Sequence, residues 1–251
     1  MTRVTRFPFP ATDATPAHAV LQRLLVVGLV AGLVAGLAVA ALQHLTTTPL
    51  IVAAEVYEHA RHVQEAAVSG VAAHEDVAQS PALRTLSTSL ATAITCIGYA
   101  LTLLALMLFA DEAIDARRAA LWGACAFAAT GLATGLGLAP QLPGAAETDL
   151  VARQIWWLAT AAFTGAGLYA LLNMQAVWAK ALGAALLLAP HLYGAPQPAA
   201  PESTVPAELA ARFTAASLTT QAVAWVLAGA LAGLLWRNFA RRESAGREAL
   251  S

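Results

Sequence analysis

The chain has 251 residues, of which 59% are hydrophobic and 12% are charged, and its net charge is −1. Soluble domains contain about 45–50% apolar and about 25% charged residues, so this composition excludes a water-soluble globule and a disordered chain. A net charge this small also excludes recruitment of nucleic acid by a global field.

Five apolar stretches are each long enough to cross a bilayer as an α-helix, which needs roughly 17–25 residues. They comprise residues 24–42, 86–110, 119–138, 155–172 and 213–236. A further stretch, residues 176–190, is shorter and holds Lys180 near its start, where the ammonium can reach the interface. The pattern predicts an all-α, polytopic membrane helix bundle of about six transmembrane helices. Five helices plus a re-entrant segment is the alternative.

The basic residues are distributed unequally if the chain starts in the cytoplasm and crosses six times. The cytoplasmic set is then Arg3, Arg6, Arg23, Arg117, Arg118, Lys180, Arg237, Arg241, Arg242 and Arg247, and the outer set is Arg61, Arg84, Arg153 and Arg212. This excess follows the positive-inside rule and predicts that both termini are cytoplasmic. The organisation is then a cytoplasmic tail over residues 1–20, a bundle over 21–237 with outer loops 43–84, 139–154 and 190–212, and a cytoplasmic tail over 238–251.

Small and polar residues recur inside the predicted spans. Glycines four residues apart, which let helix backbones approach closely, are Gly28, Gly32 and Gly36, Gly131 and Gly135, and Gly229 and Gly233. The polar side chains are Thr88, Thr92, Thr95, Tyr99, Thr160, Thr164, Thr219, Thr220 and Gln221. They predict either hydrogen bonds between helices or a path for a partly hydrated ion.

The segment after the first span carries the residues with the most distinctive chemistry. Proline suits the first turn of a helix, so Thr48 and Pro49 predict a helix start. Glu55, Glu58, His59 and His62 then recur at i, i+3, i+4 and i+7, which places them on one helix face. Two carboxylates and two imidazoles suit a borderline divalent ion such as cobalt, nickel or zinc. The stripe predicts an external metal-capture site, and a solvated juxtamembrane helix is the alternative.

A second outer loop, residues 190–198, is rich in proline and offers His191 as a further candidate metal ligand. A structured external loop without a metal is the other interpretation of this segment.

Parts of the chain resemble the CbtA family of predicted cobalt transporter subunits. The N-terminal resemblance rests on G-L-V-A-G at residues 28–32, Gln43, T-P-L-I at 48–51 and A-E-V-Y-E at 54–58. The C-terminal resemblance rests on Pro190 and His191, A-P-Q-P at 195–198, Val205 with Pro206, Leu209 and Phe213.

The resemblance covers residues 21 to about 237. It implies a polytopic protein of the bacterial inner membrane that takes up cobalt for cobalamin synthesis. It also implies a small single-helix partner of the CbtB type with a histidine-bearing end. Glu55 and Glu58 match the family's motif, whereas His59 and His62 lie outside it.

The most specific hypothesis is therefore a membrane transporter subunit for Co²⁺ or a similar divalent ion, without a tightly bound cofactor and in contact with lipid. A membrane scaffold whose acidic outer face binds a partner protein is the alternative. The sequence contains no HExxH, GxSxG or GxxxxGK[ST] motif, so an enzyme is not expected.

Overall fold

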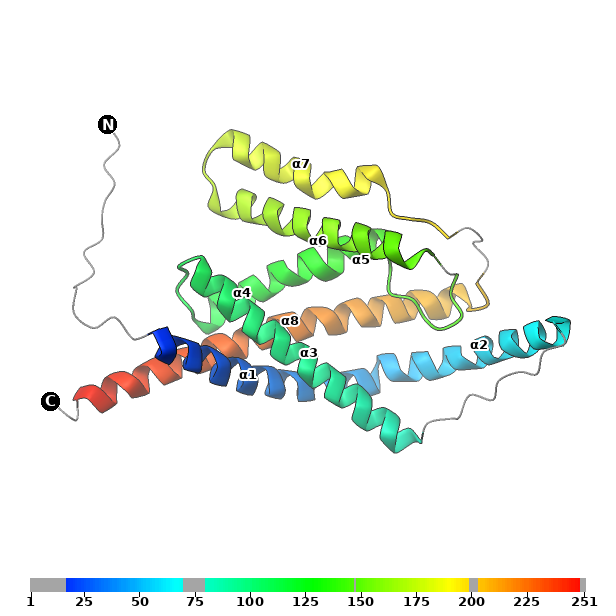
Figure 1. The fold of residues 1–251 in the computed structure, drawn as a ribbon, viewed down its shortest axis with the longest axis horizontal. Helices are drawn as coiled ribbons and strands as arrows, with labels where there is room; N and C mark the ends of the chain where they lie inside the picture. Colours follow the sequence, from blue (N-terminus) through cyan, green and yellow to red (C-terminus); the bar gives the residue numbers. More distant parts are fainter. Residues whose placement is uncertain (1–16, 70–79, 147, 199–202, 249–251) are drawn as a thin grey trace.

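The computed structural model describes residues 17–69, 80–146, 148–198 and 203–248, and none of these residues lies in a β-strand. The helices are α1 (Ala17–Leu45), α2 (Thr47–Ser69), α3 (Pro81–Phe109), α4 (Ala116–Phe127), the π-helical turn η1 (Ala128–Leu132), α5 (Ala133–Gly137), α6 (Leu150–Asn173), α7 (Val177–Tyr193) and α8 (Ala207–Glu248). The predicted all-α membrane bundle is confirmed (Figure 1).

In the described part of the chain, five helical segments are long and apolar enough to span a membrane: His18–Leu45, Pro81–Phe109, Ala116–Gly137, Leu150–Asn173 and Ala207–Arg241. They coincide with the five predicted long spans. The sixth predicted segment forms α7, whose 17 residues extend about 26 Å against roughly 30 Å of hydrocarbon. Helix α7 runs back along α6, so it returns the chain to the end of the molecule where α6 began (Figure 1).

The connections alternate between the two ends of the bundle. The start of α1, the turn from α3 to α4, the turn from α6 to α7 and the end of α8 lie at one end, whereas α2 extends from the other (Figure 1). At the first end the Arg23 guanidinium lies 4.1 Å from the centre of the Trp236 ring and donates to the Trp236 carbonyl. This arrangement agrees with an even number of crossings; which end faces the cytoplasm stays a prediction.

Glycine ridges let the central helices touch at their backbones. A Cβ atom added at Gly32 would lie 2.6 Å from the Ile97 nitrogen and 2.7 Å from the Cys96 carbonyl oxygen, so α1 and α3 are in backbone contact. Gly229 and Gly233 of α8 similarly lie against backbone atoms of Ala119 and Asp115, at α4 and the turn before it. The predicted packing role of these ridges is confirmed, and together they build the core from α1, α3, α4 and α8.

The helix predicted to follow Thr48 and Pro49 is present as α2, and it begins one residue earlier, at Thr47. Only Thr46 separates it from α1. Helix α2 therefore continues outward from the end of α1, and its buried Ala54 packs with Leu142, Val205 and Phe213. This small cluster fixes α2 against the segments that precede α6 and α8.

Candidate functional site

A polar groove of about 530 Å³ lies between α1, α3 and α8. Most of its lining side chains carry a hydroxyl, an amide or a thiol, and none carries a formal charge. The lining comprises Val39, Gln43, Thr47, Ile51, Thr88, Ala91, Thr92, Thr95, Cys96, Tyr99, Pro140, Phe213, Ser217, Thr220, Gln221 and Ala224. The groove is thus uncharged, and its hydroxyl and amide groups are set among apolar side chains.

Hydrogen bonds hold the α1 wall of the groove to the α3 wall. The Thr92 hydroxyl lies 2.6 Å from Gln43 Oε1 and 2.9 Å from the Thr88 carbonyl oxygen, so its single proton is shared between two acceptors. One turn further out, His44 Nε2 lies 3.1 Å from Ser89 Oγ. These contacts order the polar wall without closing the groove.

Glu55 of α2 lies just beyond one end of the groove. Ile51 lines the groove, and Glu55 follows it by one helical turn. The Glu55 carboxylate pairs with the Arg84 guanidinium of α3, with N···O distances of 2.8 and 3.0 Å. Both side chains stay more than a third exposed, so the pair sits in water, where such a bridge contributes only about 0–1 kcal/mol.

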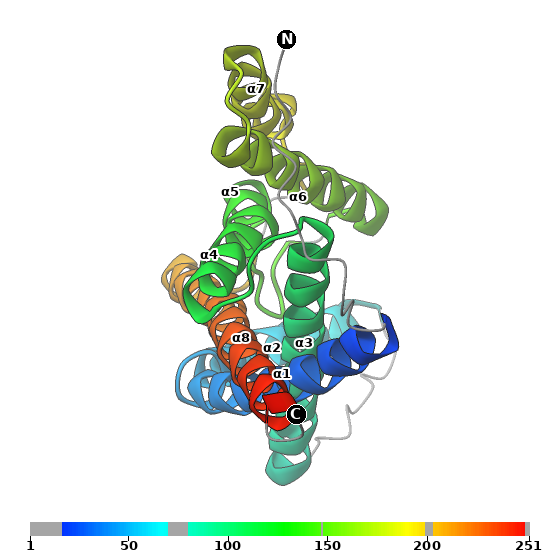
Figure 2. The ribbon, with the colours of Figure 1, turned by 90° about the vertical axis from the view of Figure 1, so that its left-hand side faces the viewer.

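The structure arranges the predicted metal ligands only in part. Glu55, Glu58 and His59 share α2, with Glu58 half-buried and His59 exposed. The side chain of His62 lies outside the described residues. His191 belongs to α7, on the other side of the bundle from α2 (Figures 1 and 2), where its ring meets Trp156 edge-on at 6.0 Å between centroids.

Within the described part of the chain, no group of three or more His, Cys, Asp and Glu side chains is placed to hold a metal ion. The α2 carboxylates therefore form an open, partly neutralised surface rather than a preformed coordination site. Such a surface can attract a hydrated cation, and a tight site would need further ligands.

The groove ends at an aromatic pair. The Tyr99 and Trp225 rings stack with centroids 3.7 Å apart and planes 9° apart. Beyond this pair, toward the end that holds the start of α1, the core is packed with apolar side chains that include Ala100, Leu104 and Met107. Apolar packing therefore closes this end of the groove.

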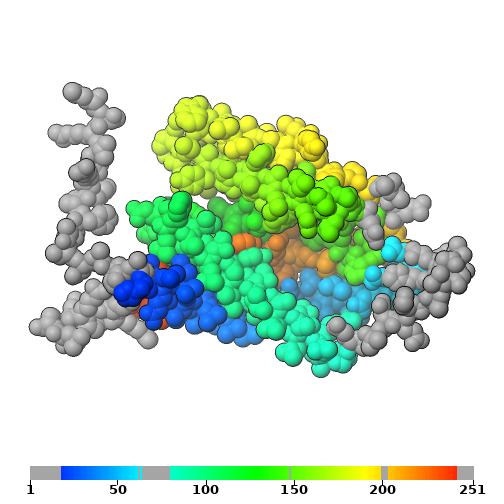
Figure 3. Space-filling view, viewed as in Figure 1, coloured from blue at the N-terminus to red at the C-terminus, as the bar shows by residue number. Residues whose placement is uncertain are grey.

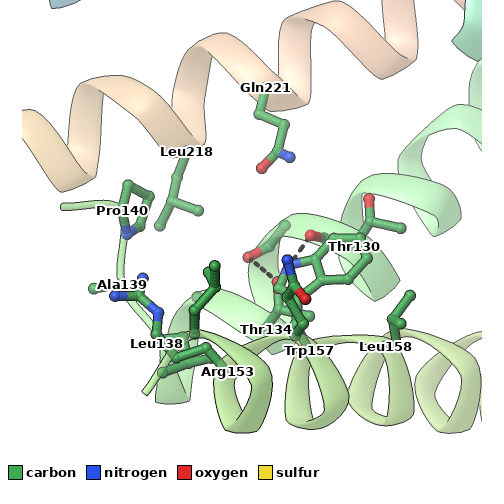
Figure 4. Close-up of a pocket in the computed structure, with 14 residues that line it drawn as sticks. Thr130, Thr134, Leu138, Ala139, Pro140, Arg153, Trp157, Leu158, Leu218 and Gln221 are labelled. Atoms are coloured by element: carbon green, nitrogen blue, oxygen red, sulfur yellow. Dashed lines mark hydrogen bonds between the residues drawn. The ribbon is translucent and has the colours of Figure 1, made fainter. Parts of the chain in front are cut away.

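A second cavity of about 590 Å³ lies between η1, α5, α6 and α8. In Figure 4, Leu218 and Gln221 of α8 point into it from one side, and Arg153, Trp157 and Leu158 of α6 lie on the other. Pro140 and Gln221 line this cavity as well as the groove, so the two spaces adjoin at α8.

Polar residues from two of the three predicted helices line the groove, and a path for an ion stays a prediction. Thr88, Thr92, Thr95 and Tyr99 of α3 face Thr220 and Gln221 of α8 across the groove. Thr160 and Thr164 of α6 lie elsewhere: both are buried, and their hydroxyls have no hydrogen-bond partner among the described residues. Thr219 also lies outside the groove, since it is exposed and donates to the Ala215 carbonyl.

Three groove residues with a side-chain oxygen did not figure in the predicted path: Gln43, Thr47 and Ser217. Gln43 belongs to the N-terminal motif that carries the family resemblance, which was a usable signal. No sequence signal identified Thr47 and Ser217, because each lies near the end of an apolar stretch, where polar residues are common.

Comparison with known proteins supplies the context for this groove. A family described as "Probable cobalt transporter subunit (CbtA)" matches residues 21–237. Searches of curated proteins and of solved structures found no match. Because the match covers most of the chain, this protein belongs to the CbtA family of probable cobalt transporter subunits.

Proposed function

We propose that this protein carries Co²⁺ inward along the polar groove between α1, α3 and α8. The observation that carries the proposal is the groove itself, which descends from the α2 carboxylates and is lined by neutral oxygen donors inside the bundle. A charged ion in hydrocarbon is strongly disfavoured, whereas hydroxyl and amide oxygens can substitute for part of its hydration shell.

The α2 surface would concentrate the ion before it enters. Glu58 and His59 belong to this surface, and Glu55 joins them when the ion displaces Arg84 from its carboxylate. Carboxylate and imidazole are suitable ligands for a borderline divalent metal. His62 remains a proposed ligand on its helical position alone, and His191 is a separate outer candidate.

The closed end of the groove fits a chain captured in its outward-open arrangement. Passage to the other side would require the Tyr99–Trp225 stack to separate. Nothing in the family match favours the scaffold alternative, and a transporter subunit is not expected to be an enzyme.

The wider setting is also part of the proposal. The word "subunit" in the family description indicates a partner, and we propose a single-helix protein of the CbtB type. We further propose the bacterial inner membrane as the location, cytoplasmic termini and a supply of cobalt for cobalamin synthesis. No tightly bound cofactor is required by this mechanism.

Cobalt uptake by cells that express the chain with its partner tests the function. Glu58→Gln should raise the apparent KM for Co²⁺ several-fold because it removes a capture charge, and Thr92→Val should lower the maximal rate because it removes a groove oxygen. Glu208→Gln is the matched control, since Glu208 is an exposed carboxylate paired with Arg212 on its own helix. Uptake unchanged in both test variants, at equal membrane level, would refute the groove as the path.

A further inference from the structure

The second cavity, between η1, α5, α6 and α8, differs from the groove in charge. Arg153 of α6 is the one formally charged side chain among the described residues that line it, whereas the lining of the groove has none. A guanidinium repels a cation that comes within a few ångströms of it, so this cavity is unsuited to be a branch of the path proposed for Co²⁺. Its charge suits an anion.

The Arg153 guanidinium keeps most of its hydrogen-bonding capacity. Its Nη1 donates to the neutral amide oxygen of Gln141, and among the described residues it pairs with no carboxylate. The nearby Asp149 carboxylate is used otherwise, since it caps α6 by accepting the Ala152 N–H at 2.7 Å. A guanidinium carries five N–H donors, so Arg153 can still hold two oxygens of a phosphate.

Arg153 lies at the level expected for lipid headgroups. It belongs to the first turn of α6, which begins at the end of the bundle from which α2 extends (Figure 1). Trp157 lies one turn further along α6, and tryptophan is enriched at the membrane interface. In Figure 4, Thr130 and Leu158 lie at the opposite end of the cavity from Arg153. Because Thr130 precedes the end of its span at Gly137 by about 10 Å of helix, the cavity extends from the interface into one leaflet of roughly 15 Å of hydrocarbon.

The deep wall of the cavity suits an acyl chain. Thr130 and Thr134 each donate their hydroxyl proton to a carbonyl of their own helix at 2.8 Å, so neither requires a partner in the cavity. Leu158 of α6 and Leu218 of α8 provide apolar contacts on opposite sides, and Gln221 adds one amide at the boundary with the groove. Figure 3 shows the surface hollowed beside α6, with α8 (orange) visible behind.

We propose that this cavity binds one anionic phospholipid, with its phosphate on the Arg153 guanidinium and one acyl chain between α6 and α8. A lipid uses both the charge and the apolar wall, whereas a free anion would use the charge alone. A protein helix about 10 Å across would fill the 590 Å³ within about 8 Å of its length, far less than a leaflet. The lipid site does not depend on cobalt transport.

Native mass spectrometry of the purified chain in detergent tests the headgroup contact. Phosphatidylglycerol is the anionic probe and phosphatidylcholine the zwitterionic one, and the parent should retain the first at least several-fold better. Arg153→Gln should remove most of this preference. Arg212→Gln is the matched control, because Arg212 is an exposed arginine near the start of α8 that pairs with Glu208 and does not line the cavity. Equal retention of the two lipids by the parent, or an unchanged preference in Arg153→Gln, would overturn the proposal.

Filling the cavity tests the position of the acyl chain. Leu158→Trp enlarges a side chain that lines the cavity and is 61% exposed, so the parent Tm should be kept in detergent without added lipid. Its binding of phosphatidylglycerol should weaken several-fold. Leu136→Trp makes the same change at a position of α5 that is 74% exposed and outside the lining, and it should bind like the parent. Parent-like binding by a folded Leu158→Trp would contradict an acyl chain between α6 and α8.

Thermal unfolding distinguishes a lipid from a free anion. A ligand that binds only the folded state raises its stability, so phosphatidylglycerol should raise the Tm of the parent and raise that of Arg153→Gln by less. Inorganic phosphate, which lacks an acyl chain, should leave both values unchanged. An equal rise with inorganic phosphate would show a simple anion site and refute the lipid.

Discussion

The glycine contact between α1 and α3 allows a quantitative test with the smallest substitution available. Gly32→Ala adds one methyl group at a position where its carbon would lie 2.6 Å from the Ile97 nitrogen and 2.7 Å from the Cys96 carbonyl oxygen. Both obstacles are backbone atoms, so no side-chain rotation relieves the overlap. The two helices must instead move apart.

The separation sets the size of the effect. Ordinary contact begins near 3.4 Å and the Ile97 Cα lies closer still than the Ile97 nitrogen, so the helices must part by roughly 1 Å at Gly32. A radial gap of 0.5–1 Å forfeits about a quarter to a half of each affected dispersion contact, and overpacking costs about 1–3 kcal/mol. Alanine also has a higher helix propensity than glycine, which offsets up to about 1 kcal/mol of this loss. We expect a net loss of about 1–2 kcal/mol.

Gly98→Ala is the matched control, because it makes the same chemical change on α3 where no atom lies within 4 Å. Thermal unfolding of the purified chain in one detergent should give a lower Tm for Gly32→Ala and an equal or higher Tm for Gly98→Ala. A Tm for Gly32→Ala equal to that of the parent would show that α1 and α3 do not touch as described.

Three further outcomes are expected. Reporters fused after residue 175, in the turn from α6 to α7, and within residues 195–198 should report opposite sides of the membrane, and matching sides would remove α7 as a crossing. Trp156→Phe should cost about 1 kcal/mol in thermal unfolding, because it removes the 3.2 Å hydrogen bond from Trp156 Nε1 to the Pro190 carbonyl; an unchanged Tm would contradict that bond. The backbone N–H of Arg118, with that of Arg117 and the Arg118 guanidinium, holds the pKa of the Asp115 carboxyl below its usual value. The ionised Asp115 therefore stabilises the fold at pH values above its unfolded-state pKa of about 3.9, and this stabilisation is lost as the pH falls through the folded-state pKa. Between about pH 5 and pH 3, the Tm of Asp115→Asn should therefore fall by less than the Tm of the parent. Equal acid sensitivity would refute the role of the charge.

The spans and their packing faces followed from the sequence because lipid imposes a local rule. Each crossing must satisfy its own backbone hydrogen bonds and be apolar along its length. A long apolar run such as residues 86–110 is therefore recognisable as a transmembrane helix from the sequence alone. Glycines four apart share a helix face whatever the surroundings, which is why the Gly28–Gly32–Gly36 ridge predicted close packing. The helix that contains Glu55 was predictable for a similarly local reason, its Thr-Pro start.

Which polar residues meet was decided only by the tertiary structure. Thr92, Thr160 and Thr220 look alike along the chain, yet α3 and α8 bring the first and third to one groove while α6 buries the second elsewhere. The ion pair between Glu55 and Arg84 joins α2 to α3. The spacing of residues within either helix does not predict this pair. Sequence spacing specifies the face of a helix on which a side chain lies, whereas the neighbour on that face depends on how separate helices fit together.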